Sequence, residues 1–225
     1  MSYIVQHFDV ILRLTGQHLF MVLLALLIST VIALPLGLLL ARYRRLATIV
    51  LGILGTLYTI PSIALLILLL PLFGLNQRSV IAALVIYTQI ILVRNIVAGL
   101  QGISPAMIEA ANGMGMNSWQ RWWLVQFPLA LPVILAGMRI AAVVATAIAT
   151  IGAKFSAGGL GTLLFDGIAQ NRYDKILSGS LVVALLAMLL NRLLLIAEDY
   201  FDPARRAEKR ERQRAAREGG MGYEV

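Results

Sequence analysis

Residues 19–41 read LFMVLLALLISTVIALPLGLLLA, a run without a charged side chain that is followed directly by Arg42-Tyr43-Arg44-Arg45. A helix rises 1.5 Å per residue, so about 20 apolar residues cross a hydrocarbon layer about 30 Å thick. The whole chain of 225 residues is 60% hydrophobic and 13% charged, whereas a soluble domain carries about 25% charged residues. A soluble domain could not hide this much apolar surface. The sequence therefore predicts an all-α protein that crosses a membrane several times.

Five segments have the length and apolar character of a membrane span. We predict spans at about 19–41, 49–73, 79–100, 129–153 and 176–197, which together form one membrane domain over residues 1–200, followed by a basic tail over 201–225. The second segment contains Pro61 and Pro71. Division at Pro61 would leave two pieces too short to cross a bilayer, so we expect one helix that is kinked or locally opened there.

The distribution of basic residues predicts the orientation, because cytoplasmic loops collect Lys and Arg. With five spans, the first connection, the 101–128 connection and the tail lie on one side. That side holds Arg42, Arg44, Arg45, Arg121, Arg205, Arg206, Lys209, Arg210, Arg212, Arg214 and Arg217, and the other holds Arg13, Arg78, Lys154, Arg172 and Lys175. We therefore predict an N-terminus outside and a C-terminus in the cytoplasm. This topology accounts for the net charge of +8, so anionic membrane lipid is an expected partner and nucleic acid is not.

The 101–128 connection is polar and contains helix start and stop signals. Ser104-Pro105 predicts a helix start over 106–112, with a capping hydroxyl and proline at the first helical position. Gly113-Met114-Gly115 predicts its end, because glycine accepts the positive φ of a helix C-terminus. Residues 104–115 therefore form the first arm of an elbow on the cytoplasmic face.

The second arm of the elbow is expected at 119–126. Asn117-Ser118 can cap this short helix, and Phe127-Pro128 is expected to end it and to start the fourth span. Its three tryptophans predict an aromatic belt at the lipid headgroups, with contact to a partner protein as the alternative. These residues are Trp119, Trp122 and Trp123.

The elbow carries a pattern that resembles a known family. Glu109-Ala110-Ala111, three residues, Gly115, nine residues, Val125, one residue and Phe127-Pro128 are similar to the EAA motif of ABC importer permeases, in which Ile and Leu stand at the positions of Val125 and Phe127. The resemblance implies that the elbow docks into a groove on a cytoplasmic ATPase. The coupling residues would be Glu109, Ala110, Ala111, Gly113, Gly115 and Pro128.

The likeness extends to other segments. TIPSIALLILLLPLFG at 59–74 and SAGGLGTLLFDGI at 156–168 resemble the osmoprotectant branch of the methionine-importer-like permease superfamily, although that branch often reads GAGGLG where this chain reads SAGGLG. Over about 15–200, the resemblance implies a bacterial inner-membrane importer of glycine betaine, choline, carnitine or related quaternary amines. A methionine-type amino acid is the alternative ligand within this class.

The resemblance also implies partners. No G-x-x-x-x-G-K-[ST] pattern occurs in the chain, so we expect ATP and Mg²⁺ to bind a separate ATPase dimer and this chain to be no enzyme. A second permease, either the same chain or a paralogue, and a periplasmic or lipid-anchored binding protein complete the expected assembly. An ion-coupled secondary transporter is the alternative from another class, but no carboxylate is predicted inside a span. The two histidines, His7 and His18, are expected to be interfacial or solvated rather than metal ligands.

Polar residues in the spans are candidates for a substrate pathway near the Pro61 break, although Ser and Thr in spans often bond their own helix backbone. The candidates are Tyr58, Thr59, Pro61, Ser62, Thr88, Gln89, Thr146 and Thr150. A flexible outer gate that contacts the binding protein is expected at Ser156, Gly158, Gly159 and Gly161. Three arginines in the spans, expected to snorkel to the inner headgroups or to pair within the bundle, are Arg94, Arg139 and Arg192.

Overall fold

The computed structural model of the chain describes residues 2–202, and all regular structure in that range is helical. The tail predicted at 201–225 therefore lies almost entirely outside the described residues. In chain order the elements are α1 (Ser2–Gln6), α2 (Phe8–Arg42), α3 (Arg44–Tyr58), α4 (Ser62–Phe73), α5 (Gln77–Gln101), α6 (Pro105–Gly113), α7 (Ser118–Arg121), the π-helix η1 (Trp122–Gln126), α8 (Phe127–Gly152), the 3₁₀ helix η2 (Ala153–Phe155), α9 (Gly161–Ala169) and α10 (Tyr173–Phe201).

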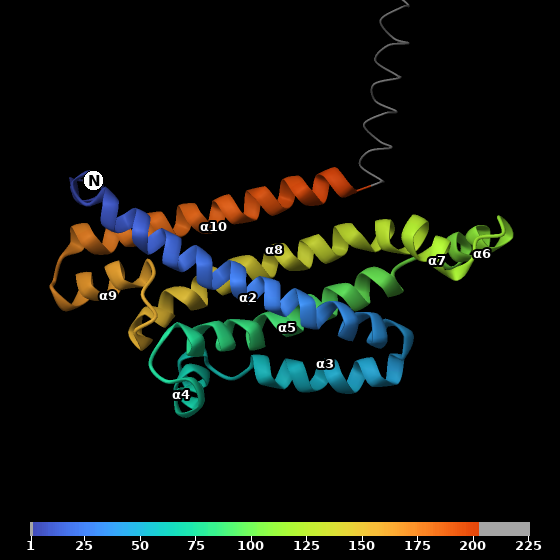
Figure 1. The fold of residues 1–225 in the computed structure, drawn as a ribbon, viewed down its shortest axis with the longest axis horizontal. Helices are drawn as coiled ribbons and strands as arrows, with labels where there is room; N and C mark the ends of the chain where they lie inside the picture. Colours follow the sequence, from blue (N-terminus) through green and yellow to red (C-terminus); the bar gives the residue numbers. More distant parts are fainter. Residues whose placement is uncertain (1, 203–225) are drawn as a thin grey trace, which may run out of the picture.

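Four long apolar helices run along the longest axis of the molecule (Figure 1). They are α2, α5, the continuous stretch Ser118–Phe155 and α10, and each is long and apolar enough to cross a membrane. The N-terminus and α9 lie at one end of this bundle, and α6 and α7 lie at the other. The fourth predicted span corresponds to α8, which begins before the predicted start and ends at Gly152, and the fifth corresponds to α10, which extends beyond the predicted limits at both ends.

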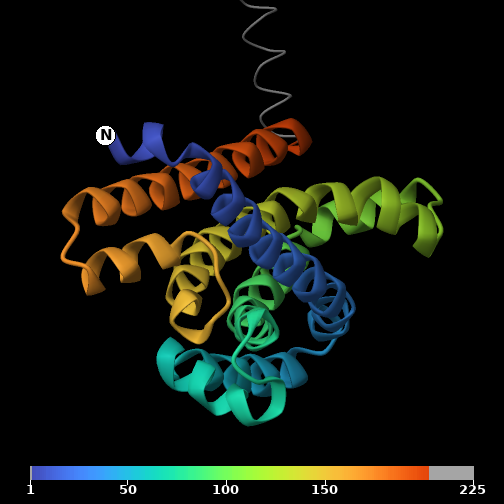
Figure 2. The same ribbon diagram turned by 60° about the vertical axis from the view of Figure 1, so that its left-hand side comes forward.

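Helix α5 is the centre of the bundle, because α2, α3, α4 and α8 all pack against it. Small residues allow these close approaches, as is common where helices associate in lipid. A Cβ atom at Gly37 would lie 2.5 Å from Ile96 Cγ2, and one at Gly137 would lie 2.5 Å from Asn95 Cβ. Helix α10 is peripheral and packs on α8 and α9. Figure 2 shows α10 and the α3–α4 pair on opposite sides of the bundle.

The predicted second span is divided into α3 and α4, which meet at an angle of 95°. Pro61 has an extended backbone, with φ −58° and ψ 137°, and as a proline it has no N–H with which to continue α3. The buried Tyr87 side chain donates a hydrogen bond to the Ile60 carbonyl, so α5 supplies a partner for the backbone at the break. The bend is sharper than the kink expected from the sequence.

Helix α8 begins at Phe127, so the predicted start of the fourth span at Phe127-Pro128 is confirmed, whereas the expectation that the second elbow arm ends there is wrong. Helicity continues from Ser118 to Phe155 through the π turn at Trp122–Gln126, where the Phe127 N–H bonds to the Trp122 carbonyl. The change of register leaves Pro128 in the first turn of α8, where a proline removes no α-helical hydrogen bond. The elbow is therefore a direct extension of the long helix.

Candidate functional site

The first arm of the elbow ends in a hydrogen-bonded glycine turn. Gly115 has a φ of +75°. Its N–H donates to the Asn112 carbonyl at 2.9 Å, and the Met116 N–H donates to the Ala111 carbonyl at 3.2 Å. This pair of bonds is a Schellman motif, which satisfies carbonyls at a helix end and requires a left-handed residue. The predicted stop at Gly115 is confirmed, whereas Ser104 makes no side-chain cap bond at the start of α6.

The second arm begins with a reciprocal cap. The Gln120 N–H donates to Asn117 Oδ1 at 2.8 Å, and the Asn117 N–H donates to Gln120 Oε1 at 3.0 Å. The predicted cap by Asn117 is confirmed, and Gln120 adds the second half of a capping box. The Asn-x-x-Gln spacing is the sequence signal that could have identified Gln120.

One side-chain bond ties the two arms together. Arg121 Nη1 in α7 donates to Asn112 Oδ1 in α6 over 2.5 Å. The two residues are nine positions apart and lie in different helices, so the spacing within a helix does not indicate that they meet. The pair was therefore not predictable from the sequence. With the Schellman turn and the capping box, this bond fixes the angle of the elbow.

The coupling residues predicted from the resemblance do not share one environment. Glu109 and Ala110 are exposed on α6, whereas Ala111 is 1% exposed and lies inside the elbow. Gly113 and Gly115 are exposed, and no atom lies within 4 Å of a Cβ built at either. Pro128 is half-buried in α8, away from this surface. Among the predicted coupling residues, the exposed ones are therefore Glu109, Ala110, Gly113 and Gly115.

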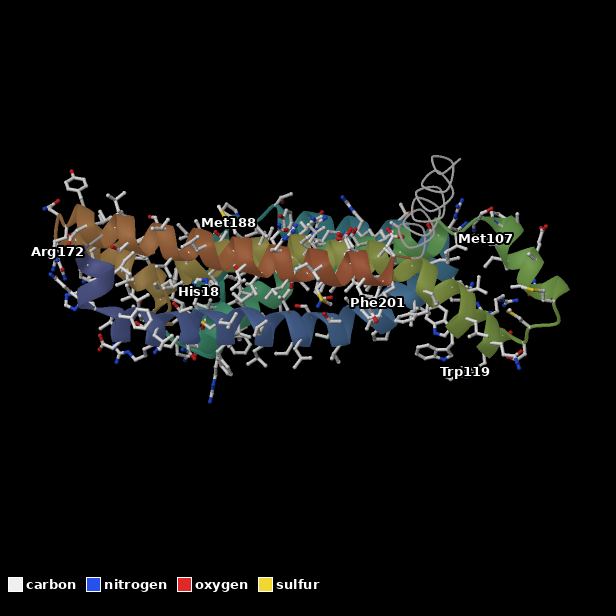
Figure 3. All side chains as sticks on the ribbon, turned by 90° about the horizontal axis from the view of Figure 1, so that it is seen from above. His18, Met107, Trp119, Arg172, Met188 and Phe201 are labelled. Carbon is white, nitrogen blue, oxygen red and sulfur yellow. The ribbon has the colours of Figure 1, made fainter. Side chains whose placement is uncertain are left out.

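Aromatic side chains form a row along the second arm and into α8. Trp119 contacts Trp123 edge-on with ring centroids 5.6 Å apart, and Trp123 contacts Phe127 in the same manner at 5.3 Å. Trp119 is 71% exposed. Figure 3 shows Trp119 and Met107 on opposite sides of the elbow, at the end of the molecule far from Arg172.

The pathway candidates around Pro61 lie at the surface of the chain. Tyr58, Thr59 and Pro61 are exposed, and Ser62 is half-buried. The Tyr58 ring meets the ring of Tyr87 edge-on, with centroids 5.7 Å apart. This group combines an open backbone break with an exposed aromatic ring.

The other pathway candidates lie between helices of the chain. Thr88 Oγ1 is 2.6 Å from the Ser29 hydroxyl, and Gln89 Nε2 donates to the Ser29 carbonyl at 3.2 Å. Thr88 and Gln89 on α5 therefore both contact Ser29 on α2. Ser29 was not among the predicted site residues. The signal that could have identified it is that Ser29 and Thr30 are the only polar residues in the apolar run 19–41. Thr146 is buried and donates to the Ala142 carbonyl at 2.8 Å, and Thr150 donates to the Thr146 carbonyl at 3.0 Å.

The glycine loop at 156–161 is bonded to α2 and α5, and its predicted role as a flexible gate stays a prediction. Gln17 Oε1 in α2 accepts the Gly159 N–H at 3.1 Å, and Gln77 Nε2 in α5 donates to the Ala157 carbonyl at 3.0 Å. Ser156, Gly158 and Gly159 all have positive φ angles. A Cβ at Gly161 would lie 1.9 Å from the Thr150 carbonyl oxygen, so only glycine fits the observed packing there.

His18 is buried, so the expectation of an interfacial or solvated side chain is wrong. Its exposed fraction is 0%, and its Nε2 lies 3.2 Å from the Thr146 carbonyl oxygen on α8. Figure 3 labels His18 within the bundle. The side chain joins α2 to α8 next to Gly159 of the glycine loop, and the contact is between residues far apart in sequence. Among residues 2–202, no group of three or more His, Cys, Asp or Glu could hold a metal ion.

One of the three arginines in the spans forms an ion pair. Arg139 Nε in α8 lies 3.3 Å from Glu198 Oε2 in α10, so the expected pairing within the bundle is confirmed for this arginine. Glu198 was placed outside the spans from the sequence, but α10 continues to Phe201 and brings it against α8. Arg94 and Arg192 are exposed.

Residues 33–207 match the family described as binding-protein-dependent transport system inner membrane component. The osmoprotectant import permease protein OsmW of Salmonella typhimurium is 40% identical over 85% of this chain and 92% of its own length. The carnitine transport permease protein OpuCB of Listeria monocytogenes is 39% identical over 77% of this chain and 80% of its own length.

Solved structures with the same fold were also found. The MetNI methionine ABC transporter in an inward-facing conformation matches with a TM-score of 0.71 and 24% identity, over 88% of this chain and 96% of the matched chain. An amino acid ABC transporter crystallised with histidines matches with a TM-score of 0.72 and 18% identity, over 88% of this chain and 97% of the matched chain. At these identities the two structures support the fold.

Proposed function

The chain belongs to the family of binding-protein-dependent transport system inner membrane components, and we propose that it imports an osmoprotectant such as glycine betaine, choline or carnitine as the permease subunit of an ABC importer. It receives the ligand from a binding protein outside the bacterial inner membrane. A separate ATPase in the cytoplasm drives the transport. The observation that carries this proposal is the elbow, which presents Glu109 and Ala110 to solvent on a frame fixed by its own hydrogen bonds.

The ligand class is supported by sequence relatives. Permease proteins named for osmoprotectant, carnitine, choline and glycine betaine transport are 33–40% identical to this chain. The methionine and amino acid transporters share the fold at 18–24% identity. An osmoprotectant is therefore favoured over a methionine-type ligand.

The proposed topology has five spans, with the bent pair α3 and α4 acting as one broken span. Irregular backbone within a membrane is tolerated where protein or a water-filled path surrounds it. In this topology the N-terminus lies outside, and the elbow and the basic tail lie in the cytoplasm. The α2–α3 junction, with Arg42, Arg44 and Arg45, lies at the same end of the bundle as α7, with Arg121 (Figure 1), and cytoplasmic segments collect basic residues.

The mechanism that we propose follows from the continuity of the elbow with the bundle. A short connection joins α6 to the central helix α5, and α7 runs through the π turn into α8 without a break. A partner that grips the exposed face of α6 therefore moves α5 and α8 together. Closure of the ATPase pair on ATP and Mg²⁺, which bind to the ATPase, would be transmitted in this way to the pathway.

The pathway that we propose passes the break between α3 and α4. Tyr58, Thr59, Pro61 and Ser62 supply polar groups and an exposed ring there, and an aromatic face attracts quaternary ammonium groups. Residues deeper in the bundle, namely Thr88, Gln89, Thr146 and Thr150, come into reach of the ligand when the helices separate.

A second permease completes the assembly in this proposal. Helix α3 has one buried residue, Ala47, so most of its apolar surface is left uncovered by this chain. Two permeases, of the same chain or of this chain and a paralogue, enclose a path that five spans alone do not. Each elbow then engages one ATPase subunit.

Uptake measurements on the complete transporter test the proposal. Proteoliposomes that contain the permease and its ATPase, with the binding protein added outside, should accumulate labelled choline or glycine betaine only with ATP inside. Replacement of Glu109 by glutamine or alanine should abolish uptake without changing the amount of permease in the membrane. ATP-dependent uptake at the wild-type rate would contradict the role of the elbow. If the binding protein retained methionine and no quaternary amine, the proposed osmoprotectant ligand would be wrong.

A further inference from the structure

A polar cavity of about 570 Å³ lies at the outer end of the bundle. Helices α2 and α5, the turn before α5 and the glycine loop form its walls. The lining contains one cationic side chain, three amide side chains and one hydroxyl, and no carboxylate. The lining residues are Gln17, Asn76, Gln77, Arg78, Ser156, Ala157 and Gly158.

The walls of this cavity are held by bonds that leave its cation free. Gln17 and Gln77 hold the glycine loop, as described above. Asn76 Oδ1 accepts the Arg78 N–H at 2.8 Å, and Asn76 Nδ2 donates to the Phe73 carbonyl at 2.6 Å. The Arg78 side chain is exposed, and no ion pair among residues 2–202 includes it.

Three other cations at this end of the chain, Arg172, Lys175 and Lys154, already have a partner. Arg172 Nη2 lies 2.6 Å from Asp174 Oδ2. Lys175 Nζ lies 3.6 Å from Asp166 Oδ2, and Lys154 lies over the Phe165 ring at 4.6 Å. Arg78 is thus distinguished from them by its unused charge.

Arg13 extends the positive charge next to the cavity. It precedes Gln17 by one turn of α2, is exposed and has no ion pair among the described residues. Side chains four residues apart lie on the same helix face. The cavity and its edge therefore form a positively charged, amide-lined recess that faces outward.

We propose that this recess, the outer arginine cavity, receives an acidic side chain of the binding protein when that protein docks; the inference rests on the proposed function. A guanidinium presents paired N–H donors that match a carboxylate, and the neighbouring amide groups can donate to the same oxygens. A quaternary ammonium ligand would be repelled by Arg78, so this recess suits the carrier protein rather than its cargo. Charge complementarity of this kind increases association rates and selects the correct partner.

Binding of the purified binding protein to the complete transporter in nanodiscs tests this inference. With R78E, the dissociation constant should rise on the order of tenfold or more, and R78Q should show a smaller rise. The affinity of the wild type should fall with added salt, and this dependence should weaken in R78Q because one screened ion pair is lost. R172Q is the matched control, because it removes the same charge from the same end of the chain at a site where Asp174 already neutralises it.

The outcomes separate the inference from the proposed function. Wild-type affinity and salt dependence in R78E would overturn the docking inference while leaving the importer intact. Equal weakening in R78Q and R172Q would also overturn it, because the effect would then be one of general surface charge.

The measurement is made with choline-loaded and with glycine betaine-loaded binding protein. Weakening confined to the glycine betaine form would assign the carboxylate to the ligand and contradict the inference. Failure of wild-type permease to engage an ATPase or a binding protein would instead refute the proposed function.

Discussion

Replacement of Gly115 by alanine is expected to loosen the elbow and to reduce uptake. Gly115 has a φ of +75°, and nothing lies within 4 Å of an added Cβ, so the cost arises from the backbone rather than from a clash. An L-residue in the left-handed region costs about 1–2 kcal/mol. If the backbone leaves that region, the bonds to Asn112 and Ala111 break, at about 1 kcal/mol each. Either route lowers the ratio of ordered to disordered elbow by about 5- to 30-fold.

The assay compares G115A, G115N and wild type in two measurements, ATP-dependent uptake and the amount of ATPase that co-purifies with the permease. Asparagine tolerates the left-handed conformation better than alanine does, so G115N should retain more of both activities than G115A. G113A adds a separate comparison. Gly113 ends α6 in helical conformation with open space around it, so alanine there does not destabilise the elbow. A loss of uptake or of ATPase binding in G113A would therefore indicate that a partner covers this surface.

Two results would refute this reasoning. Wild-type uptake in G115A would show that the glycine turn has no part in coupling. Equal losses in G115A and G115N, with ATPase binding intact, would show that the conformation at this position is not what matters.

Two further predictions concern the bundle. Y87F removes the hydroxyl that donates to the Ile60 carbonyl and should cost about 1 kcal/mol of stability. The purified permease should therefore unfold at a lower temperature. An unchanged unfolding midpoint would contradict a structural role for that bond. G161A places a methyl group 1.9 Å from the Thr150 carbonyl oxygen and should cost about 1–3 kcal/mol of stability by overpacking. G16A is the control, because nothing lies within 4 Å of a Cβ added at Gly16, and its unfolding midpoint should equal that of the wild type.

The local features of the fold could be predicted from the sequence. Long apolar runs gave the spans because the bilayer sets their length. The turn at Gly115 and the cap at Asn117 were predictable because each depends on the conformation of one or two residues. The resemblance to the EAA motif identified Glu109 and its neighbours as candidates.

The features that the sequence did not predict depend on contacts between distant segments. The 95° bend at Pro61 is accompanied by a bond from Tyr87 on another helix. The burial of His18 requires α8 to pack against α2. Neither contact leaves a periodic pattern in the sequence, and both follow from the way in which the helices assemble.

Which of the predicted coupling residues are exposed could not be predicted from the sequence either. Spacing alone treats Glu109, Ala110 and Ala111 as one group, whereas the structure exposes the first two and buries the third. The difference arises because α6 folds back on the second arm of the elbow. A variant at Ala111 would therefore test elbow packing, and one at Ala110 would test partner contact.

Photo-crosslinking from the elbow in cells tests most directly whether the elbow docks on the ATPase. A photoreactive amino acid replaces Ala110 in the full-length permease, expressed with its ATPase and binding protein, and a second variant carries it at Tyr173, which is 78% exposed at the opposite end of the chain. If the elbow docks on the ATPase, position 110 crosslinks to the ATPase and position 173 does not. Crosslinking of position 110 to the external binding protein, or efficient crosslinking to the ATPase from position 173 alone, would contradict it.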